Sequence, residues 1–280
     1  MSAALNKHNY IAVKPRFENG FRISYSRTEI TDNVESIQQP IIREALKLLD
    51  IRDCLEIVSI ADVPGGSGLG GSSSYAVGVL NALHSHKKEN VSAEKLAEEA
   101  CYIEMDRLNE PIGKQDQYVA AFGGINSYEI ALDSKVRVCP IRMSQHSEAE
   151  LENNILLFYT GITRNASTIL GEIKRNEEKG EGQVLETMHR IKEIGYEVRD
   201  ALLSGDVTRF GELLDVHWKT KKNLSNKVTS SRIDALYEIA KRNGATGGKI
   251  MGAGGGGFFM LYSESGKKKV REAMTREGLK

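Results

Sequence analysis

The stretch PGGSGLGGSSS, residues 64–74, joins a strand-like segment to a helix-like segment. Residues 55–60, LEIVSI, are apolar and partly β-branched, which predicts a strand, and residues 75–84 have helical character. Glycines let the backbone approach an anion closely, and the unpaired N–H groups at a helix start favour negative charge. The stretch therefore predicts a phosphate-binding loop. A flexible turn with a serine helix cap is the alternative.

Two standard nucleotide motifs do not fit this stretch. Residues 66–71 match G-x-G-x-x-G, but the dinucleotide fold also needs a second strand that ends in an acidic residue about 20 positions later. Residues 86–90, HKKEN, lie between two predicted helices and form no strand. The P-loop pattern requires a lysine before its Ser or Thr, and this chain has none there. What remains is the anion chemistry that both motifs share.

The remaining segments alternate irregularly between strand and helix patterns. A turn at residues 18–20 is expected to join the first two strands. Because there is no steady β-α-β alternation, the order predicts an α+β fold rather than a doubly wound parallel sheet. The polar, acidic residues 143–152 mark the best domain boundary, which gives domains 1–150 and 151–280. Strands are predicted at 9–14, 21–25, 55–60, 155–159 and 258–262, and helices at 38–49, 75–84, 92–108, 116–122, 166–179, 183–203, 232–242 and from 267.

Two carboxylates stand out because of their positions. Glu104 shares the apolar face of its predicted helix, and glutamate is rarely buried there without a partner such as a cation. Asp116 opens a short helix, where the dipole keeps a carboxylate ionised. The alternatives are a Glu104 bonded to Arg107 or to backbone, and an Asp116 that only caps its helix. With a phosphate loop, the two acids would supply the parts that phosphoryl transfer needs.

Composition narrows the range of functions. The 280 residues carry 38 basic and 38 acidic side chains, so no overall positive field attracts nucleic acid or an anionic membrane. Three widely spaced cysteines suggest neither a disulfide framework nor a zinc site. The sequence has no apolar run of about 20 residues that could cross a membrane and no signal-peptide pattern at its start. We expect a soluble, cytoplasmic protein.

Three separate segments together resemble the GHMP kinases. Residues 64–73 resemble that family's P-x-x-x-G-L-G-S-S-A loop, and residues 249–258, KIMGAGGGGF, resemble its C-terminal glycine motif. Glu104 precedes Asp116 by twelve residues, as the magnesium-binding Glu precedes the catalytic Asp in galactokinases. Residues 111–118, 158–164 and 247–257 look most like the branch with D-glycero-D-manno-heptose 7-phosphate kinases, with fucokinase-type enzymes close by.

The resemblance implies a ribosomal-protein-like N-terminal domain and a ferredoxin-like C-terminal domain, with ATP bound between them. It implies that ATP and Mg²⁺ serve to phosphorylate the anomeric hydroxyl of a sugar phosphate. Asp116 would act on that hydroxyl as base or as electrostatic orienter, and Ser72 and Glu104 would bind Mg²⁺. The residues expected to hold the ATP phosphates are Gly66, Ser67, Gly68, Leu69, Gly70, Gly71, Ser72 and Ser73.

The acceptor site is expected near the second glycine segment, at Gly252, Gly254 and Gly255. On charge grounds, Lys114 and Arg164 are candidates for the acceptor's own phosphate, although Arg164 could equally form a surface salt bridge. The chain begins at what resembles the family's second strand, so the resemblance implies that a first motif, which contributes to acceptor binding, is missing. Position 71 is Gly where many relatives have Ser.

Two other functions stay open at this point. One is a kinase of the same fold that acts on a free sugar such as fucose, which would need no basic groups in its acceptor site. The other is a non-catalytic ligand-binding or regulatory protein, against which the presence of both Glu104 and Asp116 argues. The sequence does not indicate the oligomeric state.

Overall fold

A computed structural model describes residues 1–162, 166–178 and 182–280. The chain forms two compact units. The N-terminal unit comprises residues 2–65 and 70–124, and the C-terminal unit comprises Met1, residues 66–69 and residues 125–280. Residues 125–150, assigned above to the N-terminal domain, group with the C-terminal residues; the domain boundary at 150 stays a prediction.

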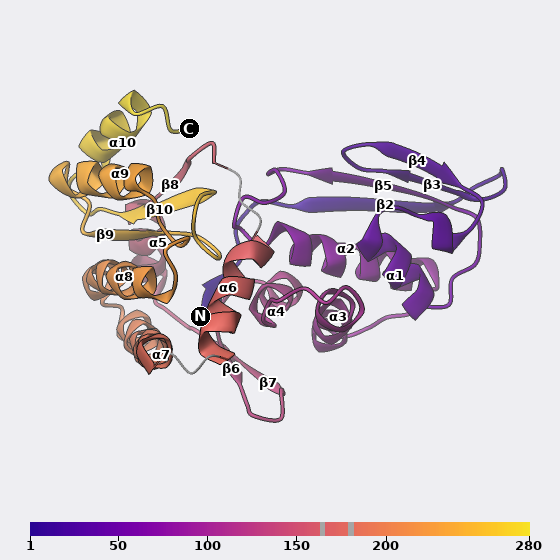
Figure 1. The fold of residues 1–280 in the computed structure, drawn as a ribbon, viewed down its shortest axis with the longest axis horizontal. Coiled ribbons are helices and arrows are strands. Elements are labelled where there is room, and N and C mark those ends of the chain that lie inside the picture. The colour runs from indigo at the N-terminus through magenta and orange to yellow at the C-terminus, as the bar shows by residue number, and fades with distance from the viewer. Residues whose placement is uncertain (163–165, 179–181) are drawn as a thin grey trace. The chain divides into compact units, whose positions relative to one another are not determined.

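The N-terminal unit combines one sheet with a stack of helices (Figure 1). Most of the predicted segments form close to their expected bounds, but the short strand β4 was not predicted. The helix predicted at 92–108 is capped by Ser92 as expected, and its last part is a π-helix. The elements are β1 Ser2–Ala3, β2 Asn9–Pro15, β3 Phe21–Ser24, β4 Thr28–Thr31, a 3-10 turn Val34–Ser36, α1 Pro40–Leu48, β5 Leu55–Ala61, α2 Gly71–His86, α3 Ala93–Cys101, the π-helix Tyr102–Arg107 and α4 Gln115–Phe122.

The first two predicted strands exist but do not pair with each other. The sheet order is β2-β5-β3-β4, so β5 lies between β2 and β3. β5 runs antiparallel to β2, with Asn9 opposite Ala61, and parallel to β3, with Ile23 opposite Ile57. The turn expected at residues 18–20 to join two neighbouring strands is therefore wrong as a hairpin. Turn residues show where a chain reverses. They do not show which strands become neighbours, and here β5 pairs with both β2 and β3.

One face of this sheet is buried under α1 and α2, and α3 and α4 lie on the far side of α2 (Figure 1). Inward side chains of β3 and β5 form a continuous apolar cluster with the helices, which includes the fully buried Ile23, Ile57 and Leu80. Burial of this cluster stabilises α2 along its length. It therefore fixes the glycine-rich segment at the helix start.

The C-terminal unit is built around the antiparallel sheet β8-β10-β9. In Figure 1, α9 and α10 lie on one side of this sheet and α8 and α7 on the other. The long helix α8 was not predicted, nor was the antiparallel pair β6 and β7. The elements are β6 Ile125–Ile130, β7 Val136–Pro140, α5 Gln145–Asn154, β8 Ile155–Tyr159, α6 Ala166–Glu178, α7 Gly182–Ser204, α8 Val207–Lys221, a 3-10 turn Lys222–Leu224, α9 Ser231–Arg242, β9 Gly247–Ile250, β10 Phe258–Tyr262 and α10 Lys267–Arg276.

Two apolar clusters cover the two faces of this second sheet. Phe259 packs with α9 and α10 residues on one face, and Tyr262 packs with α7 and α8 residues on the other. The mixture of separate sheets and helices confirms the predicted α+β fold. Within the described parts of the chain, every helix is too short or too polar to span a membrane.

Candidate functional site

The first glycine-rich segment forms a tight loop that ends at the start of α2. Gly66, Gly68 and Gly70 have φ values of 70°, 82° and 67°, which L-residues with side chains rarely adopt. Gly70 is the N-cap of α2 and no side chain caps the helix there. The first N–H groups of a 16-residue helix thus lack an intrahelical acceptor and a side-chain cap. This is the arrangement that binds phosphate at a helix start.

Ser72, in the first turn of α2, is bonded to Glu104 instead of capping the helix. Its Oγ donates to Glu104 Oε1 at 2.6 Å. The other carboxylate oxygen of Glu104 accepts from Gln117 Nε2 at 2.7 Å. Glu104 is only 2% exposed and Gln117 is fully buried, while Ser72 is exposed. The predicted pair Ser72 and Glu104 is therefore brought together, with an accessible hydroxyl above a buried carboxylate.

Asp116 lies beside the same helix start. A Cβ atom added to Gly70 would come within 3.2 Å of the Asp116 carboxyl carbon, a tight contact, and the φ of Gly70, +67°, also favours glycine there. Solvent reaches Asp116, yet the surrounding protein raises the pKa of its carboxyl by partial burial, and the negative charge of Glu104 raises it further. The carboxylates of Asp116 and Glu104 thus repel each other at the N-terminal end of α2. A cation placed there would relieve the repulsion.

The oxygen atoms at this position suit Mg²⁺. Glu104, Asp116 and the Ser72 hydroxyl supply hard oxygen donors, and Gln117 Oε1 is buried without a hydrogen-bond partner. The described residues contain no group of three or more His, Cys, Asp or Glu side chains that could hold a metal without help. Mg²⁺ is commonly held by one or two carboxylates, with waters and substrate phosphates completing its shell. The residues fit that ion.

Gln117 was missed by the sequence reasoning. It follows Asp116 directly, and in the structure its side-chain amide fixes the orientation of the Glu104 carboxylate through a hydrogen bond. A fully buried glutamine beside an accessible aspartate has no periodic signature, because the spacing alone does not show which of two adjacent polar residues points inward. The Gln117 amide contacts the Glu104 carboxylate, and its backbone adjoins Asp116, so this one residue relates the positions of the two acids.

The second glycine-rich segment connects β9 to β10 and packs against residues 66–69. A Cβ atom on Gly252 would approach Gly68 Cα to 3.0 Å, and one on Gly257 would approach the Ser67 carbonyl oxygen to 2.1 Å. The Phe258 N–H also donates to that carbonyl at 3.0 Å. Backbone therefore lies directly on backbone here, which only glycine permits.

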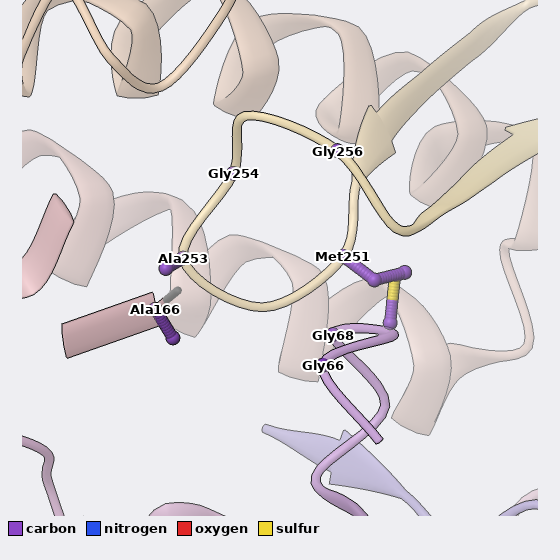
Figure 2. Close-up of a pocket in the computed structure, with 7 residues that line it drawn as sticks. All are labelled: Gly66, Gly68, Ala166, Met251, Ala253, Gly254 and Gly256. Atoms are coloured by element: carbon purple, nitrogen blue, oxygen red, sulfur yellow. The ribbon is translucent and has the colours of Figure 1, made fainter. Parts of the chain in front are cut away.

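A small cavity of about 80 Å³ lies where these segments meet. It is lined by Gly66, Gly68, Ala166, Met251, Ala253, Gly254 and Gly256. Figure 2 shows the Met251 side chain extended toward the turn at Gly66 and Gly68. Gly254 lines the cavity, whereas Gly255 donates its N–H to the Val228 carbonyl at 2.7 Å. Ser67 Oγ is buried without a hydrogen-bond partner.

The two basic candidates for an acceptor phosphate have different outcomes. Lys114 Nζ contacts both carboxylate oxygens of Glu98, at 2.8 and 3.1 Å, so its charge is already paired. Arg164 lies outside the described residues. Their role in acceptor binding stays a prediction.

Comparison with known proteins gives the family. The family model for the GHMP kinases N-terminal domain matches residues 40–124, and the model for the GHMP kinases C-terminal domain matches residues 198–280. The first match contains the loop, Glu104 and Asp116, and the second contains the glycine segment before β10. The chain belongs to the GHMP kinase family.

Several relatives within this family are sugar or sugar-phosphate kinases. The D-glycero-alpha-D-manno-heptose 7-phosphate kinase of Campylobacter jejuni is 37% identical over 208 residues, which cover 74% of this chain and 61% of that enzyme. A galactokinase of Thermococcus kodakarensis is 30% identical over 77% of this chain and 68% of its own length. The chain thus spans less than two thirds of the Campylobacter enzyme.

A solved structure agrees over nearly the whole chain. The crystal structure titled D-glycero-D-manno-heptose 1-phosphate kinase, from Bacteroides thetaiotaomicron, superposes with a TM-score of 0.78 at 25% identity. The match covers 98% of this chain and 82% of that one. The GHMP kinase fold inferred from the three sequence segments is confirmed.

Proposed function

We propose that this chain is an ATP-dependent kinase of a sugar phosphate, and that it phosphorylates the anomeric hydroxyl of D-glycero-D-manno-heptose 7-phosphate. The observation that carries the proposal is the arrangement of Asp116, Glu104 and Ser72 at the uncapped start of α2. The heptose kinase relative suggests the acceptor.

The residues have distinct roles in this proposal. The N–H groups at the start of α2 bind ATP phosphates, and residues 66–73 shape the backbone around them. Ser72 and Glu104 would hold Mg²⁺, with Gln117 orienting the Glu104 carboxylate. Mg²⁺, when bound, neutralises the charge that develops on the transferred phosphoryl group.

Asp116 acts on the acceptor. Its raised pKa makes the carboxylate a better proton acceptor than an ordinary aspartate. The hydroxyl oxygen forms a bond to the γ-phosphorus of ATP while the bond from that phosphorus to the ADP oxygen breaks. The hydroxyl proton passes to Asp116, or Asp116 orients the hydroxyl and water takes the proton. ADP and the phosphorylated sugar are the products.

One observation favours a second candidate, a kinase of a free sugar such as fucose. The charge of Lys114 is paired with Glu98, so this lysine has less to offer an acceptor phosphate. The two candidates differ in whether the acceptor must carry a phosphate.

ADP release with ATP and Mg²⁺ tests both candidates. The acceptor panel contains heptose 7-phosphate, fucose, galactose and mevalonate. Turnover with the heptose phosphate alone supports the proposal, and turnover with fucose alone supports the second candidate. ATP binding without turnover on any acceptor would contradict both and would favour a ligand-binding role.

A further inference from the structure

A group of basic side chains lies between α8 and β9, away from the carboxylates described above. His217 and Lys221 are four residues apart on α8 and therefore share a face of that helix. Lys249 is on β9, two residues after Gly247 and on the same side of the strand. A Cβ atom on Gly247 would meet the Gly211 carbonyl oxygen of α8 at 2.1 Å, so this side of β9 faces α8.

No carboxylate balances these charges within the described ranges. Lys221 and Lys249 form no ion pair there, whereas Lys219, on the same helix, pairs with Asp215 at 2.7 Å. The Lys221 ammonium donates to the Gly252 carbonyl, at the start of the glycine segment between β9 and β10. Nδ1 of His217 is buried without a hydrogen-bond partner.

The pKa values of these basic groups are lowered, which shows that their surroundings disfavour the charged forms. Burial lowers the pKa of Lys221 to about 7, with Lys249 adding to the effect, and burial lowers the pKa of Lys249 to about 8. Burial and then Lys249 lower the pKa of His217 to about 2, so this ring is neutral. The amino group of Met1 is a further cation whose pKa is lowered by burial and then by Lys249. Lys221 and Lys249 are partly buried without a carboxylate partner in the described ranges, which is unfavourable, and an anion would relieve it.

We propose that Lys221, Lys249 and His217 form a binding subsite for a phosphate group. The inference rests on the proposed function, because a kinase of a sugar phosphate has two phosphate-bearing substrates. A phosphate monoester or the terminal phosphate of ATP can carry two negative charges, which matches two ammonium groups with a neutral imidazole as a further hydrogen-bond partner. Through Lys221 the subsite is joined to the loop at Gly252.

Steady-state kinetics of Lys221→Met and Lys249→Met test the subsite. Each change removes one charge and keeps an unbranched side chain that is one heavy atom shorter. We expect the KM for one phosphate-bearing substrate to rise about 10- to 100-fold, the cost of losing a charged hydrogen-bond donor. A rise for the sugar phosphate assigns the subsite to the acceptor, and a rise for ATP assigns it to the nucleotide. The exposed Lys219→Met is the matched control and should leave both KM values unchanged.

Calorimetry provides a readout that loss of structure would not mimic. An anion raises the pKa of both amines, so at pH 7.5 binding by the wild-type chain should take up protons. The heat of binding will then depend on the ionisation enthalpy of the buffer. Lys221→Met should show less proton uptake. Both variants should melt no lower than wild type, since each loses a partly buried charge that has no ion-pair partner among the described residues.

The proposal and the function can fail separately. If the wild-type chain turns over the sugar phosphate but both variants keep wild-type KM values and proton uptake, the subsite is wrong and the function stands. If no sugar phosphate is turned over, the function fails. ATP and inorganic phosphate are then titrated by calorimetry into wild type and variants, and equal affinities would overturn the subsite.

Discussion

At the scale of single residues, the site depends on two acids that differ in exposure. Glu104 is buried and held by Ser72 and Gln117, whereas solvent reaches Asp116. Their repulsion raises the pKa of Asp116 in addition to the effect of burial. Such unfavourable charge is typical of functional sites, where stability is given up for chemistry.

Asp116→Asn should lower kcat about 10²- to 10⁴-fold while ATP binding is largely kept, because the carboxylate acts on the acceptor. It should also raise Tm slightly at neutral pH. The folded pKa of Asp116 lies above its ordinary value, so its ionisation favours the unfolded chain as pH rises through that pKa. The stability difference should vanish below about pH 3.8, the ordinary value.

Melting curves from pH 3 to 8 and ADP-release assays provide the measurements. Asp106→Asn, an exposed aspartate on the neighbouring π-helix, is the control and should change neither quantity. A fall in ATP affinity as large as the fall in kcat would contradict the role assigned to Asp116.

Gly257→Ala should destabilise the chain through one close contact. Its φ is +86° and a Cβ atom would lie 2.1 Å from the Ser67 carbonyl oxygen. Gly278 has nearly the same φ, +85°, with open space around it. We expect Gly257→Ala to lower the free energy of unfolding by about 2 kcal/mol more than Gly278→Ala does. Urea unfolding of the two variants isolates the contact from the backbone strain, and equal losses would show that residues 66–69 move away freely.

At the scale of elements, a buried histidine ties α2 to α3. Both ring nitrogens of His84 lie 2.7 Å from carboxylate oxygens, one of Glu89 and one of Glu99. The ring thus bridges two carboxylates, with one ring nitrogen within hydrogen-bond distance of each. The side chain is 1% exposed. It connects the helix that starts at the glycine loop with the helix that leads to Glu104.

His84→Gln should therefore reduce the free energy of unfolding by about 2 kcal/mol, since it breaks a hydrogen-bond network centred on a fully buried ring that contacts two carboxylates. Urea unfolding followed by circular dichroism measures the change. His86→Gln, two residues further on the same helix, should stay within about 0.5 kcal/mol of wild type. Similar losses in the two variants would show that the His84 contacts contribute little.

Elements were easier to predict from the sequence than their partners. β5 and α1 were predicted because their apolar spacing reports a local backbone period. The pairing of β2 with β5 was not, because strand order depends on residues far apart in the chain. Glu104 was found through its place on an apolar helix face and Asp116 through its place at a helix start. The Gln117 contact and the bond from Ser72 to Glu104 depend on how α2, the π-helix and α4 pack.

At the scale of the whole molecule, residues 66–69 belong to a different compact unit from the residues on either side of them. The C-terminal unit has apolar clusters on both faces of its sheet, so most of its core is local to residues 125–280. What it takes from earlier in the chain is Met1 and the short segment under the second glycine-rich loop.

A fragment of residues 125–280 should fold and unfold cooperatively, because it carries both of its apolar clusters. Its Tm should lie below that of the full chain, since Phe258 loses the Ser67 carbonyl. Thermal unfolding by circular dichroism and calorimetry measures both properties. A fragment without a cooperative transition would show that residues 66–69 are essential for this unit to fold.

The glycine segment between β9 and β10 also has a genetic consequence. Every missense change in a glycine codon adds at least a Cβ atom, and at Gly252, Gly254, Gly256 and Gly257 that atom would lie within about 3 Å of backbone. We therefore expect most single substitutions at these four glycines to destabilise the chain. A change of acceptor is then expected to come from side chains other than these four glycines.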